Sequence, residues 1–247
     1  MNLSMNLDLK LSRRSLSLAA SSLFAASALP AWAQVTVTTV LNEGQNYQVL
    51  KARQNVLAGA GKIEIHEFFW YGCPHCNSID QPLHDWLKKQ GPDVVLRRSH
   101  IDFGERTEAH QRLFYTLEAM GELNKQHAAV FTAIHGEKKA LANKAQVLDW
   151  AKSRGLDVAK FDAAYSSFSM SATLNRSKQL MADYKVEGVP YFAIDGRLVT
   201  SPSIAQGSQA NFFGVMDSLI AKVRTERKPD AKPAAKPAAK PAVKPAS

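Results

Sequence analysis

The chain has 247 residues, and its 31 Lys and Arg against 22 Asp and Glu give a formal net charge of +9. Most of this excess lies at the two ends. Lys10, Arg13 and Arg14 stand near the start, and the segment from Lys222 to Ser247 holds eight Lys and Arg against two acidic residues. The body between them is close to neutral, so composition implies no basic face, and we expect no nucleic-acid partner.

The first 33 residues have the pattern of an export signal. Basic residues precede an apolar stretch from Leu16 to Leu29, and Ala31-Trp32-Ala33 forms a small-x-small cleavage site. The stretch is too short, and too rich in Ala and Ser, to favour a membrane anchor. Arg13 and Arg14 also resemble a twin-arginine signal, but the Ser-Leu-Ser after them fits that pattern poorly, so we expect export by the Sec route. The mature protein should fold in an oxidising compartment outside the cytoplasm.

The strongest strand signal runs from Lys62 to Trp70. Apolar residues occupy most of one face, and the second face becomes apolar towards the end of the segment. This pattern is typical of a central strand that is increasingly buried on both sides. We expect Asn42 to Gly61 to be loop or weak structure, and the alternating Val35 to Thr38 to form a short edge strand.

A helix and a second strand should follow this first strand. The helix runs on after Cys76 as far as Gln90, where Gly91-Pro92 stops it, and Pro82 should kink it. The second strand begins at Val94 and ends near His100.

The remaining body of the chain divides into three parts. From Thr107 to Tyr184 apolar residues recur at the helical period. Val189 to Thr200 predicts a hairpin with a type I′ turn at Asp195-Gly196. A last helix should start near Ser208. This order predicts one α/β layer interrupted by a block of helices.

The end of the chain repeats Lys-Pro-Ala-Ala with small variations. Proline recurs every four residues, and the only large apolar side chain from Pro229 onward is Val243. Such a segment can form neither a core nor a regular helix, so we expect residues 225–247 to be a disordered cationic tail.

The only two cysteines of the chain, Cys73 and Cys76, stand two residues apart where the strand from Lys62 meets the following helix. This spacing is typical of a redox dithiol. Unpaired N–H groups and the positive end of the helix dipole stabilise a thiolate at the first cysteine. We therefore predict Cys73 as the exposed nucleophile and Cys76 as the resolving thiol. Pro74 should restrict the loop, and His75 should place positive charge beside the sulfur when it is protonated.

A stabilised thiolate favours the reduced form of the pair, so the disulfide should be a strong oxidant. Other interpretations of the cysteines are weaker. A c-type haem needs a histidine directly after the second cysteine, where Asn77 stands. A purely structural disulfide would close so short a loop that it stabilises the fold little. A zinc site would need a second Cys pair in addition to the nearby histidines, which are His66, His75, His84 and His100.

Three segments together resemble the DsbA family of periplasmic thiol:disulfide oxidases: Glu67-Phe68-Phe69, Cys73-Pro74-His75-Cys76 and Gly188-Val189-Pro190. The resemblance extends over about Val35 to Val223. It implies an α/β thioredoxin fold with an inserted helical domain, in which residues 34–106 and 179–224 form the thioredoxin-like domain and residues 107–178 the insertion. It also implies a periplasmic location, unfolded exported proteins with free thiols as clients, and reoxidation by a DsbB-like membrane quinone reductase. No cofactor beyond the Cys73–Cys76 disulfide is implied.

The resemblance also assigns roles around the dithiol. Pro190 would be cis and lie against the sulfurs, and the backbone of Val189 would pair with the client. Glu67 would assist proton transfer beneath the dithiol, and its place on the strand predicts a desolvated carboxyl with a raised pKa. The family's usual lysine partner is matched here by Arg98, which can act only as a fixed counter-charge because it does not give up its proton.

Trp70 and Tyr71 either line the client surface or belong to the core. We count both among the candidate substrate-binding residues.

The leading hypothesis is a monomeric oxidase that donates its disulfide through a mixed disulfide at Cys73, with a broad apolar groove because its clients vary in sequence. A disulfide isomerase or reductase of the same fold is the alternative enzyme, although no separate dimerisation domain is visible in the sequence. A chaperone-like client-binding module with inert cysteines is the alternative from another class. Rapid alkylation of Cys73 well below neutral pH, with Cys76 protected, would exclude that module.

Overall fold

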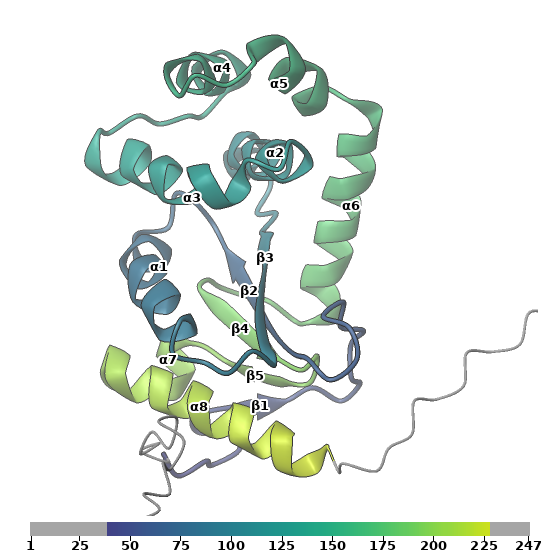
Figure 1. Ribbon diagram of the computed structural model, residues 1–247, viewed down its shortest axis with the longest axis vertical. Helices are drawn as coiled ribbons and strands as arrows, with labels where there is room; N and C mark the ends of the chain where they lie inside the picture. The colour runs from purple at the N-terminus through teal and green to yellow at the C-terminus, as the bar shows by residue number, and fades with distance from the viewer. Residues whose placement is uncertain (1–38, 228–247) are drawn as a thin grey trace, which may run out of the picture. The chain divides into compact units, whose positions relative to one another are not determined.

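The computed structural model describes residues 39–227. Within this range the strands form one five-stranded sheet in the order β1-β5-β4-β2-β3 (Figure 1). β2 and β3 are parallel, and every other neighbouring pair is antiparallel. The strands are β1 (Gln48–Val49), β2 (Ile63–Phe69), β3 (Val94–His100), β4 (Tyr191–Ile194) and β5 (Leu198–Thr200). The predicted export signal, the strand expected at Val35 to Thr38 and the chain from residue 228 onward lie outside the described residues.

β2 lies inside the sheet, between β3 and β4. All seven of its residues are buried, which confirms the prediction of a central strand covered on both faces. Burial is complete from Ile63 onward rather than increasing along the strand, so Glu64 and His66 are buried as well. β1 falls in the segment that we expected to be loop or weak structure, because its two residues are too few to show any period.

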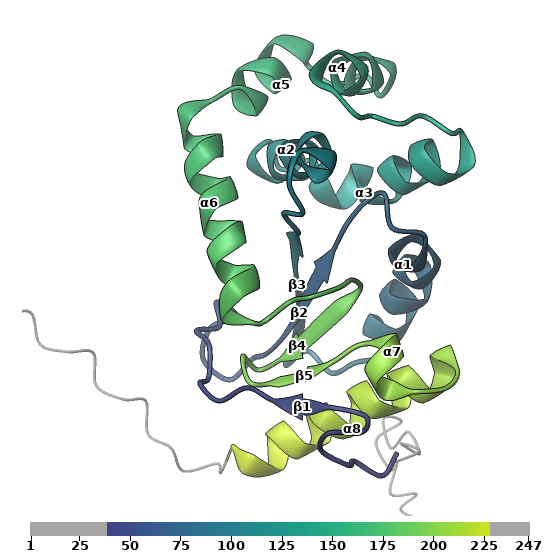
Figure 2. The same ribbon diagram turned by 180° about the vertical axis from the view of Figure 1, so that it is seen from behind.

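Helices cover both faces of the sheet (Figures 1 and 2). α1 (Pro74–Leu87) and α8 (Gln209–Glu226) pack on the face of β2 that carries Ile63 and Ile65. α6 (Phe168–Asp183) leads into the cluster on the opposite face, where Phe68 packs against Tyr184. The short α7 (Pro202–Ala205) precedes α8. α1 ends at Leu87 rather than at Gln90, and α8 continues to Glu226, so the start of the predicted tail is helical.

The predicted block of helices lies between β3 and β4. It contains α2 (Glu105–Ala119), α3 (Leu123–Phe131), the π-helix η1 (Thr132–Gly136), α4 (Lys144–Ser153), α5 (Val158–Tyr165) and α6. Its apolar core includes Phe69 from the end of β2, as well as Tyr71, Cys73 and Cys76. The helical block therefore packs directly against the segment that carries the dithiol. No helix in residues 39–227 has both the length and the apolar character needed to cross a membrane.

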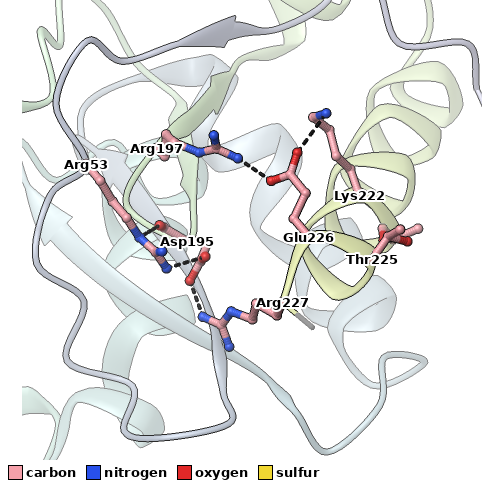
Figure 3. A network of polar contacts seen from close by, with 8 residues as sticks. Arg53, Asp195, Arg197, Lys222, Thr225, Glu226 and Arg227 are labelled. Atoms are coloured by element: carbon pink, nitrogen blue, oxygen red, sulfur yellow. Dashed lines mark hydrogen bonds and ion pairs between the residues drawn. The ribbon is translucent and has the colours of Figure 1, made fainter. Parts of the chain in front are cut away.

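The hairpin between β4 and β5 turns at Asp195 and Gly196, whose φ values of 55° and 69° fit the predicted type I′ turn. A Cβ at Gly196 would lie 2.3 Å from the backbone oxygen of Gln54, so only glycine fits there. The buried Asp195 carboxylate accepts hydrogen bonds from Arg53 and from Arg227 at the end of α8 (Figure 3). These ion pairs join the turn to the chain before β2 and to the last helix.

Replacing Asp195 with Asn should lower the free energy of unfolding by about 1 to 3 kcal/mol, since both guanidinium groups would lose a buried counter-charge while remaining partly solvated themselves. Asn tolerates the positive φ, so the turn itself should persist. Urea unfolding measures the effect. Asp149→Asn, at an exposed aspartate of α4, is the control and should change stability by less than about 0.5 kcal/mol. An unchanged midpoint for Asp195→Asn would show that the ion pairs contribute nothing.

Candidate active site

Cys73 is the N-cap of α1, and the helix begins at Pro74. The N–H of Cys73 donates to the carbonyl of Trp70 at 3.0 Å, and the carbonyl of Cys73 accepts from the N–H of Asn77 at 3.1 Å. Both cysteines are free thiols in this structure. The strand-to-helix turn thus places the Cys73 sulfur at the helix N-terminus, where the sequence pattern predicted it.

The two sulfurs have opposite acidities. The pKa of Cys73 falls from 9.0 to about 6, chiefly because the Cys76 thiol donates a hydrogen bond to its sulfur, an effect that outweighs the opposing cost of burial. Backbone N–H groups of Cys76 and His75 lower this pKa further, and the charge of His75 contributes least among these causes. Burial and the neighbouring Cys73 raise the pKa of Cys76. One thiol therefore ionises readily while the other keeps its proton.

Cys73 is less exposed than we expected, with 7% of its surface accessible. Its sulfur lies 3.6 Å from the carbonyl oxygen of Val189, in the loop that leads into β4. The loop covers the sulfur from one side, an effect of chain folding that local sequence does not encode. Pro74 and His75 are exposed beside it, whereas Cys76 is fully buried.

The Val189-Pro190 peptide bond is cis, as the family resemblance implied. Both residues line a groove of about 830 Å³ that lies next to the start of α1. The groove is bordered by apolar side chains such as Ile204 and Phe212, and by polar ones such as His75. It is therefore mixed in character rather than uniformly apolar.

A buried network of charges lies beneath the dithiol. Glu67 and Arg98 are directly paired across β2 and β3, and the guanidinium of Arg98 donates to the Glu67 carboxylate at 2.8 Å. Burial raises the pKa of Glu67, as predicted, although the charge of Arg98 opposes the shift. Arg98 also donates to Asp80 of α1 at 3.1 Å. The predicted counter-charge is thus shared by two carboxylates.

Asp80 and His127 were missed by the sequence analysis. Asp80 follows Cys76 by one helical turn and so lies on the same side of α1, a signal that could have identified it. His127 of α3 lies 3.2 Å from the Asp80 carboxylate through Nε2 and 2.9 Å from the hydroxyl of Tyr71 through Nδ1. No local pattern indicates His127, because its contacts depend on how the helical block folds back.

The two aromatic residues before the dithiol do not lie in the groove. The Tyr71 side chain has no exposed surface and packs in the core of the helical block, so its prediction as a substrate-binding residue is wrong. The physical reason is that the helical block covers the end of β2. Trp70 is partly buried, and it folds back over Gly72, where a Cβ would lie 2.4 Å from its ring.

Within residues 39–227 no group of three or more His, Cys, Asp or Glu side chains is arranged to hold a metal ion. The histidines considered for a zinc site differ in their surroundings. His66 is buried on the α6 side of β2 and bonds Ser99, whereas His75 and His84 are on exposed surfaces. The zinc interpretation therefore finds no support in the described part of the chain.

Comparison with known proteins agrees with this geometry. The family model described as a DSBA-like thioredoxin domain matches residues 64–212. The chain is 43% identical over 164 residues to the Thiol:disulfide interchange protein DsbA of Bordetella parapertussis, covering 66% of this chain and 78% of that protein. It is 36% identical over 184 residues to the protein of the same name from Burkholderia cepacia, covering 74% and 86%.

The crystal structure of Pseudomonas aeruginosa DsbA superimposes with a TM-score of 0.69 at 36% identity, covering 74% of this chain and 94% of that one. The chain therefore belongs to the family of DSBA-like thioredoxin-domain proteins, and it is a thiol:disulfide oxidoreductase with a thioredoxin fold that is interrupted by a helical insertion.

Proposed function

We propose that this protein oxidises the thiols of unfolded exported proteins by donating its Cys73–Cys76 disulfide. The observation that carries the proposal is the opposite acidity of the two sulfurs, which favours the dithiol product and gives it one thiolate and one thiol. A pair whose reduced form is stabilised in this way is a strong oxidant.

The reaction has two exchange steps. A client thiolate attacks the Cys73 sulfur, the Cys73–Cys76 bond breaks, and Cys76 leaves as a thiolate that takes up a proton. A second client thiolate then attacks the client sulfur of the mixed disulfide and releases the Cys73 thiolate. Two electrons pass from the client to the protein, and the client gains one disulfide.

The residues around the sulfurs support these steps. A lowered pKa makes Cys73 a good leaving group in the second step. Pro74 restricts the turn, and His75 stands exposed beside the groove. Glu67 serves as a proton carrier for Cys76, since its charge acts on that thiol and burial keeps its own pKa above the usual range. Arg98 keeps its charge and holds Glu67 in place.

The client chain binds in the groove beside α1. Val189 and Pro190 form part of its wall, and the backbone of Val189 pairs with the client as an added strand would. The mixture of apolar and polar lining suits clients of varied sequence.

The proposal includes a periplasmic site of action, with export directed by residues 1–33, and a monomer that needs no cofactor beyond its own disulfide. Reoxidation by a DsbB-like membrane quinone reductase completes the cycle, because each turnover leaves the protein reduced. The division into a thioredoxin-like domain of residues 34–106 and 179–224 and an insertion of residues 107–178 belongs to the same proposal. The order of the described elements supports an insertion between β3 and β4, and the helices place its limits slightly wider, because α2 begins at Glu105 and α6 ends at Asp183.

Trapping the mixed disulfide tests this function. In Cys76→Ser, Cys73 is first joined to a small aromatic thiol as a mixed disulfide, and this protein is then mixed with a reduced, unfolded protein that has a single cysteine. We expect a stable covalent complex through Cys73, because neither Cys76 nor a second client thiol is present to release the client. The matched variant Cys73→Ser should form little complex, since Cys76 is buried. Equal trapping by both variants would refute the assignment of Cys73 as the nucleophile.

A further inference from the structure

Four histidines from four different elements hydrogen-bond to Trp70 and Tyr71, the two residues that precede Gly72 and the dithiol. We call this set the histidine clamp. Its members are His100 at the end of β3, His110 on α2, His127 on α3 and His135 in the π-helix η1.

Two members of the histidine clamp act as hydrogen-bond acceptors. The indole N–H of Trp70 donates to Nδ1 of His110 at 3.0 Å. The backbone N–H of Tyr71 donates to Nε2 of His100 at 3.3 Å.

Both acceptors must be neutral, because a ring nitrogen that accepts a hydrogen bond carries no proton, and the single proton of each ring lies on the other nitrogen. Nε2–H of His110 donates to the carbonyl of Ala140 at 2.8 Å, and Nδ1–H of His100 donates to the carbonyl of Ile101 at 3.0 Å. Burial, which lowers the pKa of His100 and of His110, keeps them in this state.

The other two members also form hydrogen bonds with Tyr71. Nε2–H of His135 donates to the backbone carbonyl of Tyr71 at 2.8 Å. His127 contacts the Tyr71 hydroxyl at 2.9 Å and is itself held by Asp80. The N–H, the carbonyl and the hydroxyl of Tyr71 thus each face a different histidine. The π-helix that carries His135 is a rare element that often occurs at functional sites.

The clamped residues contact both sulfur-bearing residues. The carbonyl of Trp70 accepts the N–H of Cys73 at 3.0 Å, and a backbone hydrogen bond joins Trp70 to the sulfur of Cys76. The Trp70 ring covers Gly72, so it also limits how the turn can move. A shift of Trp70 would therefore change the separation between the two cysteines.

We propose that the histidine clamp positions Trp70 and Tyr71, and through them holds Cys76 where its thiol donates a hydrogen bond to the Cys73 sulfur. The four histidines are positioning residues that touch neither client nor reacting sulfur. Through His110, His127 and His135, the helical insertion adjusts the chemistry of a dithiol carried by the thioredoxin-like part of the chain. The proposal rests on the proposed role of Cys73 as the nucleophile.

The test compares His110→Leu with His110→Asn in the full-length mature protein. The pH midpoint of the Cys73 thiolate is followed by its ultraviolet absorbance, and the equilibrium with glutathione is measured in parallel. In His110→Leu the midpoint should rise by about 1 unit, and the equilibrium measured at about pH 8 should move roughly tenfold towards the oxidised protein. The side-chain oxygen of Asn can replace Nδ1 as the acceptor, so His110→Asn should restore most of both values. His84→Leu, at an exposed histidine of α1, should leave both unchanged.

The donor side of the same hydrogen bond provides a second test that does not require His110→Leu to fold. Trp70→Phe removes the indole N–H together with the five-membered ring that carries it, and it should shift the midpoint in the same direction. If both variants act through one bond, the double variant should shift no further than either single variant. A lower melting temperature with unchanged midpoint and equilibrium in either folded variant would overturn the proposal, because the clamp would then be only structural. An ordinary thiol midpoint in the unmodified protein would instead refute the proposed function.

Discussion

At pH 5 the reduced protein should be alkylated at Cys73 far faster than an ordinary thiol. A thiol with a pKa of about 6 is about 9% ionised at that pH, about 900-fold more than one with a pKa of 9.0. The lower nucleophilicity of a more acidic thiolate, with a Brønsted coefficient of about 0.45, offsets about 20-fold of this gain and leaves an advantage of about 40-fold. At pH 7 the expected rate advantage of Cys73 over an ordinary thiol is only about fourfold, so the measurement at pH 5 is the decisive one.

Mass spectrometry after a short exposure to iodoacetamide should locate the label at Cys73 and not at Cys76. Cys76→Ala removes the largest cause of the lowered pKa, the hydrogen bond from the Cys76 thiol, so the alkylation midpoint of Cys73 should rise in that variant. Cys76→Ser keeps a donor and should shift it less. Labelling of both cysteines at equal rates, or a midpoint near that of a free cysteine, would contradict the assignment.

The same acidity predicts how the stability of the reduced form depends on pH. The pKa of Cys73 is lower in the folded protein than in the unfolded chain, so the unfolded chain binds the extra proton between about pH 6 and pH 9. The stabilisation is therefore fully present above the upper limit and is lost as the pH falls through the lower one. Urea unfolding of the reduced protein across this window, compared with Cys73→Ser, isolates the contribution.

Replacing Arg98 with Met should lower the free energy of unfolding by about 3 to 5 kcal/mol. Arg98 donates to Glu67 at 2.8 Å and to Asp80 at 3.1 Å, and the exposed fractions of those two carboxylate side chains are 3% and 15%. Removing the guanidinium leaves the Glu67 and Asp80 carboxylates without this counter-charge in a poorly solvated site. Urea unfolding at neutral pH measures the loss.

Two comparisons make this prediction specific. Adding Glu67→Gln and Asp80→Asn to Arg98→Met should recover part of the stability, because no uncompensated charge then remains in the network. Lys125→Met removes a lysine from the exposed pair with Glu122 and should cost less than about 1 kcal/mol. If Arg98→Met costs no more than that surface control, the buried network does not stabilise the fold.

The sequence predicted the central strand, the helix after the dithiol and the hairpin, because each depends on a local pattern. The seven-residue period-two segment of β2 and the turn residues Asp195-Gly196 carry their own signals. The pairing of Glu67 with Arg98 was also accessible, since it follows from the family resemblance and the parallel register of β2 and β3. The two-residue β1 shows no period and could not be predicted.

The surroundings of the dithiol were harder to predict. Tyr71 follows an apolar strand and could equally face a client or a core, and only the packing of the helical block decides that it is buried. The contact between Val189 and Cys73 likewise joins residues far apart in the chain, and so do the contacts of His127. Such contacts depend on tertiary folding, which composition and periodicity do not describe.

The equilibrium of the isolated protein with reduced and oxidised glutathione tests the central claim most directly. An acidic Cys73 beside a protonated Cys76 stabilises the dithiol, so we expect a reduction potential less negative than about −180 mV, the value for protein disulfide isomerase. A potential near that of thioredoxin, about −270 mV, would mean that the dithiol is made to reduce other proteins rather than to oxidise them.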